Sequence, residues 1–164
     1  MSCFEDAFDE VIGLEGGYSN HPADPGGETK WGISKTAFPH LDIANLTLED
    51  AKQIYWQRYW NPLILSQLHS CKVATEVFEQ AVNMGRGRAV RHAQEAVRLV
   101  GKQHISVDGV MGGLTIAQLN TVSLINEEAV LKTLNGLQFE WYRQLTTANP
   151  SLKVFFVGWL RRIG

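Results

Sequence analysis

The stretch EGGYSNHPADPGGETKWGI, residues 15–33, sets the organisation of the whole chain. It holds five of the fifteen glycines and two of the five prolines, a composition that excludes a regular helix. Its other residues include carboxylates, hydroxyls, an amide and an imidazole. A glycine-bent loop with so many polar groups is typical of a functional site rather than of a plain connection.

The chain outside this loop carries the apolar spacing of amphipathic helices. Apolar residues at three- and four-residue steps predict helices over residues 4–12, 47–59, 70–84, 89–100, 115–122, 127–147 and 152–163. Thr47-Leu-Glu-Asp50 is a capping-box variant that begins the second helix, and Asn61-Pro62 stops it. Trp31-Gly-Ile33 is β-prone and predicts a small hairpin, after which Ser34 begins a brief helix. We therefore expect an all-α fold with one irregular loop.

Composition and charge narrow the possible partners. The 164 residues are 45% hydrophobic and 20% charged, as in an ordinary globular protein that folds around one core. A net charge of −2 without a basic stripe argues against nucleic acid. The apolar runs are too short to span a bilayer, so no stable membrane insertion is expected. Cys3 and Cys71 are expected to be free thiols, with one disulfide as the alternative.

The first residues, Met-Ser-Cys-Phe-Glu-Asp, are acidic and include no basic region followed by an apolar run. This pattern predicts a protein that is cytoplasmic on synthesis, without a signal peptide. Any work outside the cytosol then needs a holin or another export route that this chain does not encode. We also expect the protein to be a monomer.

The loop brings two carboxylates, Glu15 and Asp24, onto one short segment. Glycoside hydrolysis needs two such groups in different environments, one protonated as the acid and one ionised. Glu15 follows the expected end of the first helix, where the negative end of the helix dipole opposes ionisation and raises the pKa of a carboxyl. Thr29 adds a hydroxyl that can hold a water molecule. This set of residues favours a glycosidase.

Other readings of the same loop stay open at this point. His21, Asp24 and Glu28 could bind a metal, although no zinc or calcium spacing is met. Ser19 and Ser34 lack the context of an activated nucleophile. A turn held together by polar hydrogen bonds is the remaining alternative. We predict neither a metal nor another cofactor.

The loop also resembles a known family. Glu15-Gly-Gly-Tyr followed by His21-Pro-x-Asp24-Pro-Gly-Gly-x-Thr29-x-x-Gly-Ile33 is similar to the signature of glycoside hydrolase family 108. The members of this family are N-acetylmuramidases, which are found in bacteria and as phage or prophage endolysins. Three later segments extend the resemblance: residues 78–85, the Asp-Gly turn of residues 107–115, and residues 156–162. The Asp-Gly turn resembles that of the predicted peptidoglycan-binding segment in these proteins.

The resemblance implies a fold, a division of the chain and a reaction. It implies a lysozyme-like helical domain with a catalytic half over residues 1–85. Residues 86–164 would form a helical half that resembles a peptidoglycan-binding segment and packs with the first as one compact unit. The implied reaction is hydrolysis of the β-1,4 bond between N-acetylmuramic acid and N-acetylglucosamine, so the implied partner is the glycan strand of peptidoglycan.

The resemblance also implies roles for individual residues. Glu15 takes the place of the family's catalytic acid, and Asp24 becomes the general base. In phage-type lysozymes five residues lie between the second group and the threonine, whereas here only four residues separate Asp24 from Thr29. A water-placing role for Thr29 favours an inverting reaction, with retention through a nucleophilic Asp24 as the alternative.

Three further residues are predicted to bind substrate: Tyr18, His21 and Asn83. Tyr18 could line a sugar subsite or pack beneath the loop. Asn83 could bond an acetamido group or cap its own helix. A competing hypothesis is a non-catalytic module that binds peptidoglycan or a partner protein as an accessory to secretion.

Overall fold

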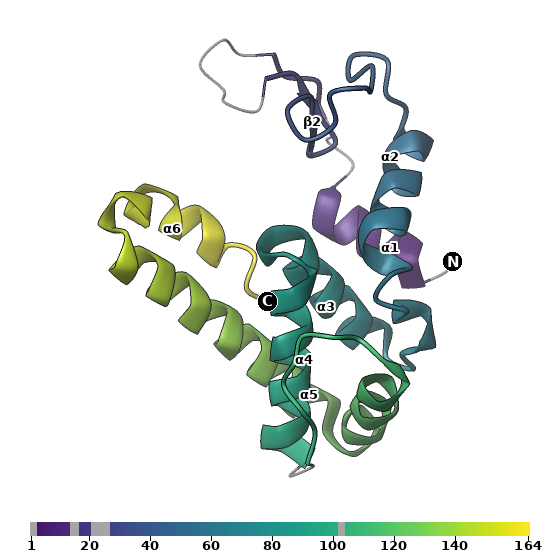
Figure 1. The fold of residues 1–164 in the computed structure, drawn as a ribbon, viewed down its shortest axis with the longest axis vertical. Helices are drawn as coiled ribbons and strands as arrows, with labels where there is room; N and C mark the ends of the chain where they lie inside the picture. Colours follow the sequence, from purple (N-terminus) through teal and green to yellow (C-terminus); the bar gives the residue numbers. More distant parts are fainter. Residues whose placement is uncertain (1–2, 14–16, 21–26, 102–103) are drawn as a thin grey trace. The chain divides into compact units, whose positions relative to one another are not determined.

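The computed structural model describes residues 3–13, 17–20, 27–101 and 104–164. The described chain is mainly helical and divides into two compact units, Met1–Pro62 (unit one) and Leu63–Gly164 (unit two). The elements of unit one are α1 (Cys3–Ile12), β1 (Thr29–Lys30), β2 (Ile33–Ser34), α2 (Leu48–Tyr55) and η1 (Trp56–Trp60). Those of unit two are η2 (Leu65–Gln67), α3 (Cys71–Met84), α4 (Arg86–Gly101), α5 (Gly113–Ala148), η3 (Pro150–Leu152) and α6 (Lys153–Leu160) (Figure 1). The predicted helical fold with a short hairpin is confirmed.

Helix α1 buries the apolar face that its sequence predicts. Phe4 and Phe8 are buried, and the Phe4 ring lies 5.0 Å from that of Trp56 and 5.3 Å from that of Trp60 between centroids. Both contacts are edge-to-face, the geometry that aromatic pairs prefer. The chain leaves the helix at Gly13, whose φ of 76° is easy for glycine and ends the helical path.

Helix α2 begins at the predicted capping box. The Thr47 Oγ accepts from the Asp50 amide at 3.1 Å, and the Asp50 carboxylate accepts from the Thr47 amide at 3.0 Å. The predicted α-helix to residue 59 is wrong in its second half, since residues 56–60 form the π-helix η1. A π-turn takes in one more residue than an α-turn, and here Trp60 is buried at its end.

Unit two is built on α3, α4 and α5. Helix α3 is capped by Ser70, whose Oγ accepts from the Val73 amide at 3.1 Å. The unit buries mainly small and branched apolar residues: Val73, Ala74, Val77, Phe78, Ala81, Ala89, Val90, Ala93, Ala96, Val97, Ile116, Leu119, Val122, Val130 and Leu134. Figure 1 shows the last helix, α6, lying along the C-terminal half of α5.

Helix α5 contains the two helices that the sequence predicts in this region. The backbone of Asn126 is not helical (φ −157°, ψ 80°), so the element is broken at this residue. The Asn126 Oδ1 then accepts from the Ala129 amide at 3.0 Å and so begins the second part. The predicted break between residues 122 and 127 is therefore confirmed.

Two other expectations are corrected. Residues 34–46 are described throughout and contain no helix after Ser34, which lies in β2 and accepts from the Ala37 amide at 3.3 Å in a turn. Neither Cys3 nor Cys71 is a free thiol, because both are disulfide-bonded. Over the described residues, the structure contains no helix with the length and apolar character needed to cross a membrane.

Candidate active site

The described part of the loop is organised by a minimal hairpin. Strands β1 and β2 pair antiparallel, with Lys30 opposite Ile33, so Trp31 and Gly32 alone form the connection. Both connecting residues have positive φ, 54° at Trp31 and 72° at Gly32, which is the pattern of a tight two-residue hairpin turn. A Trp in this conformation is uncommon for a bulky residue and marks a strained position.

Tyr55 of α2 holds this turn in place. Its hydroxyl donates to the Trp31 carbonyl at 3.1 Å, and burial raises the pKa of Tyr55, so the phenol stays protonated and able to donate. A Cβ added at Gly32 would lie 2.6 Å from the same hydroxyl. Gly32 is therefore required twice, by its positive φ and by the approach of Tyr55.

A second backbone contact closes the loop. The Ser19 amide donates to the Thr29 carbonyl, and the Thr29 amide donates to the Ser19 carbonyl, each at 2.8 Å. These two bonds form an antiparallel bridge that adds Ser19 to the edge of the hairpin. The segment 20–28 therefore begins and ends at one place, and it includes the position of Asp24.

Tyr18 and Glu28 pair beside this bridge. The Tyr18 hydroxyl donates to the Glu28 Oε1 at 3.0 Å, and this bond, which ionisation would break, raises the pKa of Tyr18. Tyr18 is 45% exposed, more than a side chain packed beneath the loop would be. An exposed aromatic side chain is what stacking on a sugar would require. The sequence had offered Glu28 only as a metal ligand, whereas here it anchors Tyr18.

Thr29 is fixed in orientation. Its Oγ donates to the Gly27 carbonyl at 3.2 Å, and the residue is half-buried. Because its proton is directed at Gly27, the hydroxyl oxygen keeps lone pairs with which to accept from a water molecule. Gly27 itself has a φ of 67°, the third positive φ in this part of the chain.

Three of the predicted site residues, Glu15, His21 and Asp24, lie outside the described residues. Their positions are thus fixed only along the chain: α1 ends at Ile12, and Glu15 follows three residues later. Among the described residues, no cluster of His, Cys, Asp or Glu could hold a metal ion. The structure brings Tyr18 close to Thr29, because Thr29 pairs with Ser19 in the bridge and Tyr18 directly precedes Ser19.

Asn83 belongs to unit two, in the last turn of α3. Its Nδ2 donates to the Glu79 Oε1 at 2.6 Å and to the Glu79 carbonyl at 3.0 Å. The end of the helix is instead closed by Gly85, whose amide donates to the Ala81 carbonyl at 3.0 Å. The Asn83 side chain is therefore not the cap of its helix. Its donors are used inside α3, and among the described residues its Oδ1 accepts no hydrogen bond.

Glu79 is a candidate functional residue that the sequence reasoning missed. It is 8% exposed, and burial, followed by the charge of Glu76, raises its pKa to about 7. Besides Asn83, it accepts from the Gln138 Nε2 at 2.8 Å. The available signal was a carboxylate inside the apolar stripe of α3, since an acidic side chain is almost never buried without partners.

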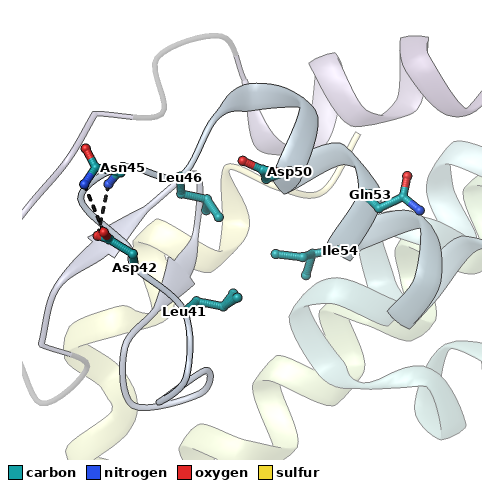
Figure 2. Close-up of a pocket in the computed structure, with 7 residues that line it drawn as sticks. All are labelled: Leu41, Asp42, Asn45, Leu46, Asp50, Gln53 and Ile54. Carbon is teal, nitrogen blue, oxygen red and sulfur yellow. Dashed lines mark hydrogen bonds between the residues drawn. The ribbon is translucent and has the colours of Figure 1, made fainter.

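The pocket beside the α2 N-terminus does not belong to this candidate site (Figure 2). It has a volume of about 380 Å³, and its lining consists of Leu41, Asp42, Asn45, Leu46, Asp50, Gln53 and Ile54. Its two carboxylates are occupied locally: Asp42 accepts from Asn45, and Asp50 completes the capping box. These bonds lower the pKa of both groups, so they are ionised structural acceptors.

The comparisons with known proteins divide the chain into two parts. Residues 8–85 match the family described as Glycosyl hydrolase 108, and residues 88–164 match the family described as Predicted Peptidoglycan domain. The chain therefore carries a glycosyl hydrolase 108 domain followed by a predicted peptidoglycan domain, as the resemblance implied. The loop of residues 15–33 lies within the first match.

The whole chain also resembles a solved structure. It is similar to the protein described as the structure of Brucella abortus SagA, with a TM-score of 0.75 and 29% sequence identity. The similarity covers 98% of this chain and 88% of that chain. No curated protein matches the chain.

Proposed function

We propose that this glycosyl hydrolase is an N-acetylmuramidase, which cleaves the β-1,4 bond between N-acetylmuramic acid and N-acetylglucosamine in peptidoglycan. The observation that carries the proposal is the match of residues 8–85 to glycosyl hydrolase 108 in the same chain as a predicted peptidoglycan domain. The first match supports hydrolysis of a glycosidic bond, and the second supports peptidoglycan as the polymer that contains this bond.

In this proposal Glu15 is the general acid that protonates the leaving oxygen. Asp24 is the general base, and Thr29 helps to hold the attacking water. The orientation of the Thr29 hydroxyl, with its proton on the Gly27 carbonyl, supports this role because it leaves lone pairs for a water proton. Water activated by a base on the face opposite the leaving group gives inversion at the anomeric carbon.

Tyr18 and His21 are proposed to contact the sugar from the loop. The open Tyr18 ring, with its hydroxyl held by Glu28, supports stacking against a pyranose face. Asn83 of unit two is a separate proposal, in which its Oδ1 accepts from the N–H of an acetamido group while its Nδ2 is bonded to Glu79. We further propose an endolysin-type role, with synthesis in the cytosol and a separate export route to the wall.

The test is lysis of purified cell walls, followed by turbidity, with wild type and Glu15→Gln. The amide keeps the shape of the side chain but cannot donate the proton, so we expect the rate to fall by roughly 10²-fold or more at an unchanged melting temperature. Glu10→Gln is the matched control, since Glu10 is an exposed carboxylate of α1, and it should lyse walls at the wild-type rate.

A different result would favour the competing function, a binding-only module. That function predicts that wild type pellets with intact cell walls but leaves their turbidity unchanged, and that Glu15→Gln pellets equally well. The stereochemistry has its own measurement, the proton spectrum of freshly released fragments. An α-anomer that appears first supports inversion with Asp24 as base, whereas an initial β-anomer would make Asp24 a nucleophile.

A further inference from the structure

A pocket in unit two, lined by residues of α4 and α5, has the chemistry of an anion site. Its volume is about 250 Å³. We call it the arginine pocket, and its lining includes Arg88, Arg91, Glu95, Glu140 and Trp141. All of these residues fall in the predicted peptidoglycan domain, residues 88–164.

Arg88 is held ready for a ligand. The Cζ of its guanidinium lies 3.6 Å from the centroid of the Trp141 ring, a close cation–π contact between α4 and α5. An arginine already ordered in this way loses less side-chain entropy when it binds, which favours binding. A planar guanidinium is also the group that best matches a carboxylate, because it can donate two parallel hydrogen bonds.

Each carboxylate of the pocket is paired with an arginine other than Arg88 or Arg91. Glu140 accepts from Arg143 through both oxygens, each at 2.7 Å, and this pairing lowers the pKa of Glu140 to about 2. Glu95 lies 3.7 Å from Arg98. Within the described residues, neither Arg88 nor Arg91 forms an ion pair. The two guanidinium groups of the pocket therefore carry positive charge that no direct ion pair within the described residues offsets.

Asp108 and His92 lie near the two arginines but form no ion pair with them. Asp108 is close enough to Arg91 to feel its charge, but the Asp108 Oδ1 accepts from the Gln94 Nε2 at 2.8 Å and from the Val110 amide at 2.9 Å. His92 is neutral near pH 7, because burial, followed by the charge of Arg88, lowers its pKa to about 4. Partial burial, followed by the charge of Arg91, lowers the pKa of Arg88.

The size of the arginine pocket and the apolar part of its lining limit the kinds of ligand that it can bind. A volume of about 250 Å³ is below the roughly 300–1,000 Å³ of most small-molecule sites, so it suits one residue of a ligand rather than a disaccharide. Val107 and Leu137 add apolar surface beside the two arginines. We propose that the arginine pocket binds the terminal carboxylate of a peptidoglycan stem peptide, with the small side chain of that terminal residue against Val107 and Leu137.

This proposal rests on the wall-directed function proposed above, but its test does not need catalysis. The full chain is titrated by calorimetry with diacetyl-L-lysyl-D-alanyl-D-alanine, a stem-peptide mimic without sugar, and with the C-terminal amide of the same peptide. We expect the acid to bind roughly tenfold or more tightly than the amide, because charged hydrogen bonds to the arginines are lost in the amide.

The variants Arg88→Gln and Arg91→Gln should each weaken binding of the acid by roughly tenfold. Arg91 is exposed, so its variant keeps the fold even if removal of Arg88 from Trp141 disturbs it. Arg58→Gln is the matched control: Arg58 lies 4.7 Å over the Phe38 ring in unit one, so the same charge and the same kind of contact are removed elsewhere.

Equal affinities for acid and amide would overturn the proposal, and so would arginine-pocket variants that bind like Arg58→Gln. Competition by inorganic phosphate as strong as that of the peptide would show a general anion site and would reject the peptide as ligand. A chain that binds the peptide but never lyses walls would retain the arginine pocket and reject the muramidase. A chain that lyses walls but does not bind the peptide would do the reverse.

Discussion

The loop region of unit one and the helices of unit two treat polar groups in opposite ways. Around the hairpin, the conformation is held by the backbone, through the Ser19–Thr29 bridge and three residues with positive φ. The polar side chains there, such as Tyr18, stay exposed or half-buried. In unit two, polar side chains are buried and satisfy one another, as Glu79 and Gln138 do at 2.8 Å.

This difference means that polar groups of the loop are available for binding and catalysis, whereas those of unit two stabilise the fold. Polar groups in a loop that is ordered by its own backbone can face a substrate, because the fold does not need their hydrogen bonds. Buried polar groups are committed, and each loss leaves an unpaired partner at a cost of about 1–3 kcal/mol. Substitutions in the two regions should therefore differ in whether they lower the stability of the fold or the activity.

The largest loss of stability should come from Gly32→Ala. The new Cβ would lie 2.6 Å from the Tyr55 hydroxyl, and alanine at φ 72° is strained by about 1–2 kcal/mol before any repacking. With the displacement of Tyr55 included, we expect a loss of about 3–5 kcal/mol in denaturant unfolding. Gly17→Ala is the control, since a Cβ there meets nothing within 4 Å. Equal losses in the two variants would mean that Tyr55 does not hold the turn.

The next effect is on the pH dependence of stability, to which two buried groups of unit two, His92 and Glu79, contribute with opposite sign. Burial lowers the pKa of His92 to about 4, so the stability it contributes is present above pH 6.5, its ordinary pKa, and is lost as the pH falls towards 4. Burial raises the pKa of Glu79 to about 7, so its contribution is present below pH 4.5 and is lost as the pH rises towards 7. Each term amounts to roughly 3 kcal/mol, at about 1.4 kcal/mol for each pKa unit.

The two contributions change in opposite directions between pH 4.5 and 6.5. Replacing one of the two residues should therefore leave the pH dependence of the other visible. Relative to wild type, His92→Gln should become progressively less stable as the pH rises through this range. Glu79→Gln should show the opposite trend. Urea unfolding midpoints measured at intervals of half a pH unit would test this, and parallel profiles for wild type and both variants would contradict it.

Asn83→Ala should have an intermediate effect on stability. It removes one of the donors to Glu79, which costs about 2 kcal/mol because the acceptor is a carboxylate. If Asn83 also bonds the substrate, lysis should fall by more than the loss of folded protein explains. Asn83→Asp keeps the acceptor oxygen but brings a second carboxylate next to Glu79, so it should destabilise the fold more than alanine does. A loss of activity that only follows unfolding would remove Asn83 from the binding site.

The smallest effect on stability should come from Tyr18→Phe. The lost bond to Glu28 is exposed, so the free energy of unfolding should change by less than about 1 kcal/mol. The ring is retained, so sugar stacking should survive and lysis should change little. Tyr18→Ala removes the ring and should raise KM at the same stability. A melting temperature that falls as far as in Gly32→Ala would contradict the contrast between the two regions.

The sequence predicted the elements whose signals are local. The capping box at Thr47, the break near Asn126 and the hairpin of the loop each depend on residues a few positions apart, and each is present. The π-helix after Tyr55 was missed because apolar spacing fits an α-helix equally well over so few residues. The helix expected after Ser34 fails because its cap sits in a strand.

The candidate site was predictable only in part. Tyr18 and Thr29 were named from the sequence, but the partners that orient them, Glu28 and Gly27, follow from how the loop closes. Glu79 was missed because its burial depends on Gln138, which is 59 residues away. The roles of Glu15, His21 and Asp24 remain predictions from the sequence.

The π-helix η1 has a consequence for how related chains should be aligned. A helix that absorbs one extra residue hides an insertion inside a regular element, where length differences are least expected. Removal of exposed Gln57 would return the segment to α geometry, and the later side chains should keep their faces, because the π-turn has absorbed the extra residue. Trp60 should then remain buried against Phe4. Homologues one residue shorter in this region should place their gap within residues 56–60 and keep an aromatic pair at the positions of Phe4 and Trp60.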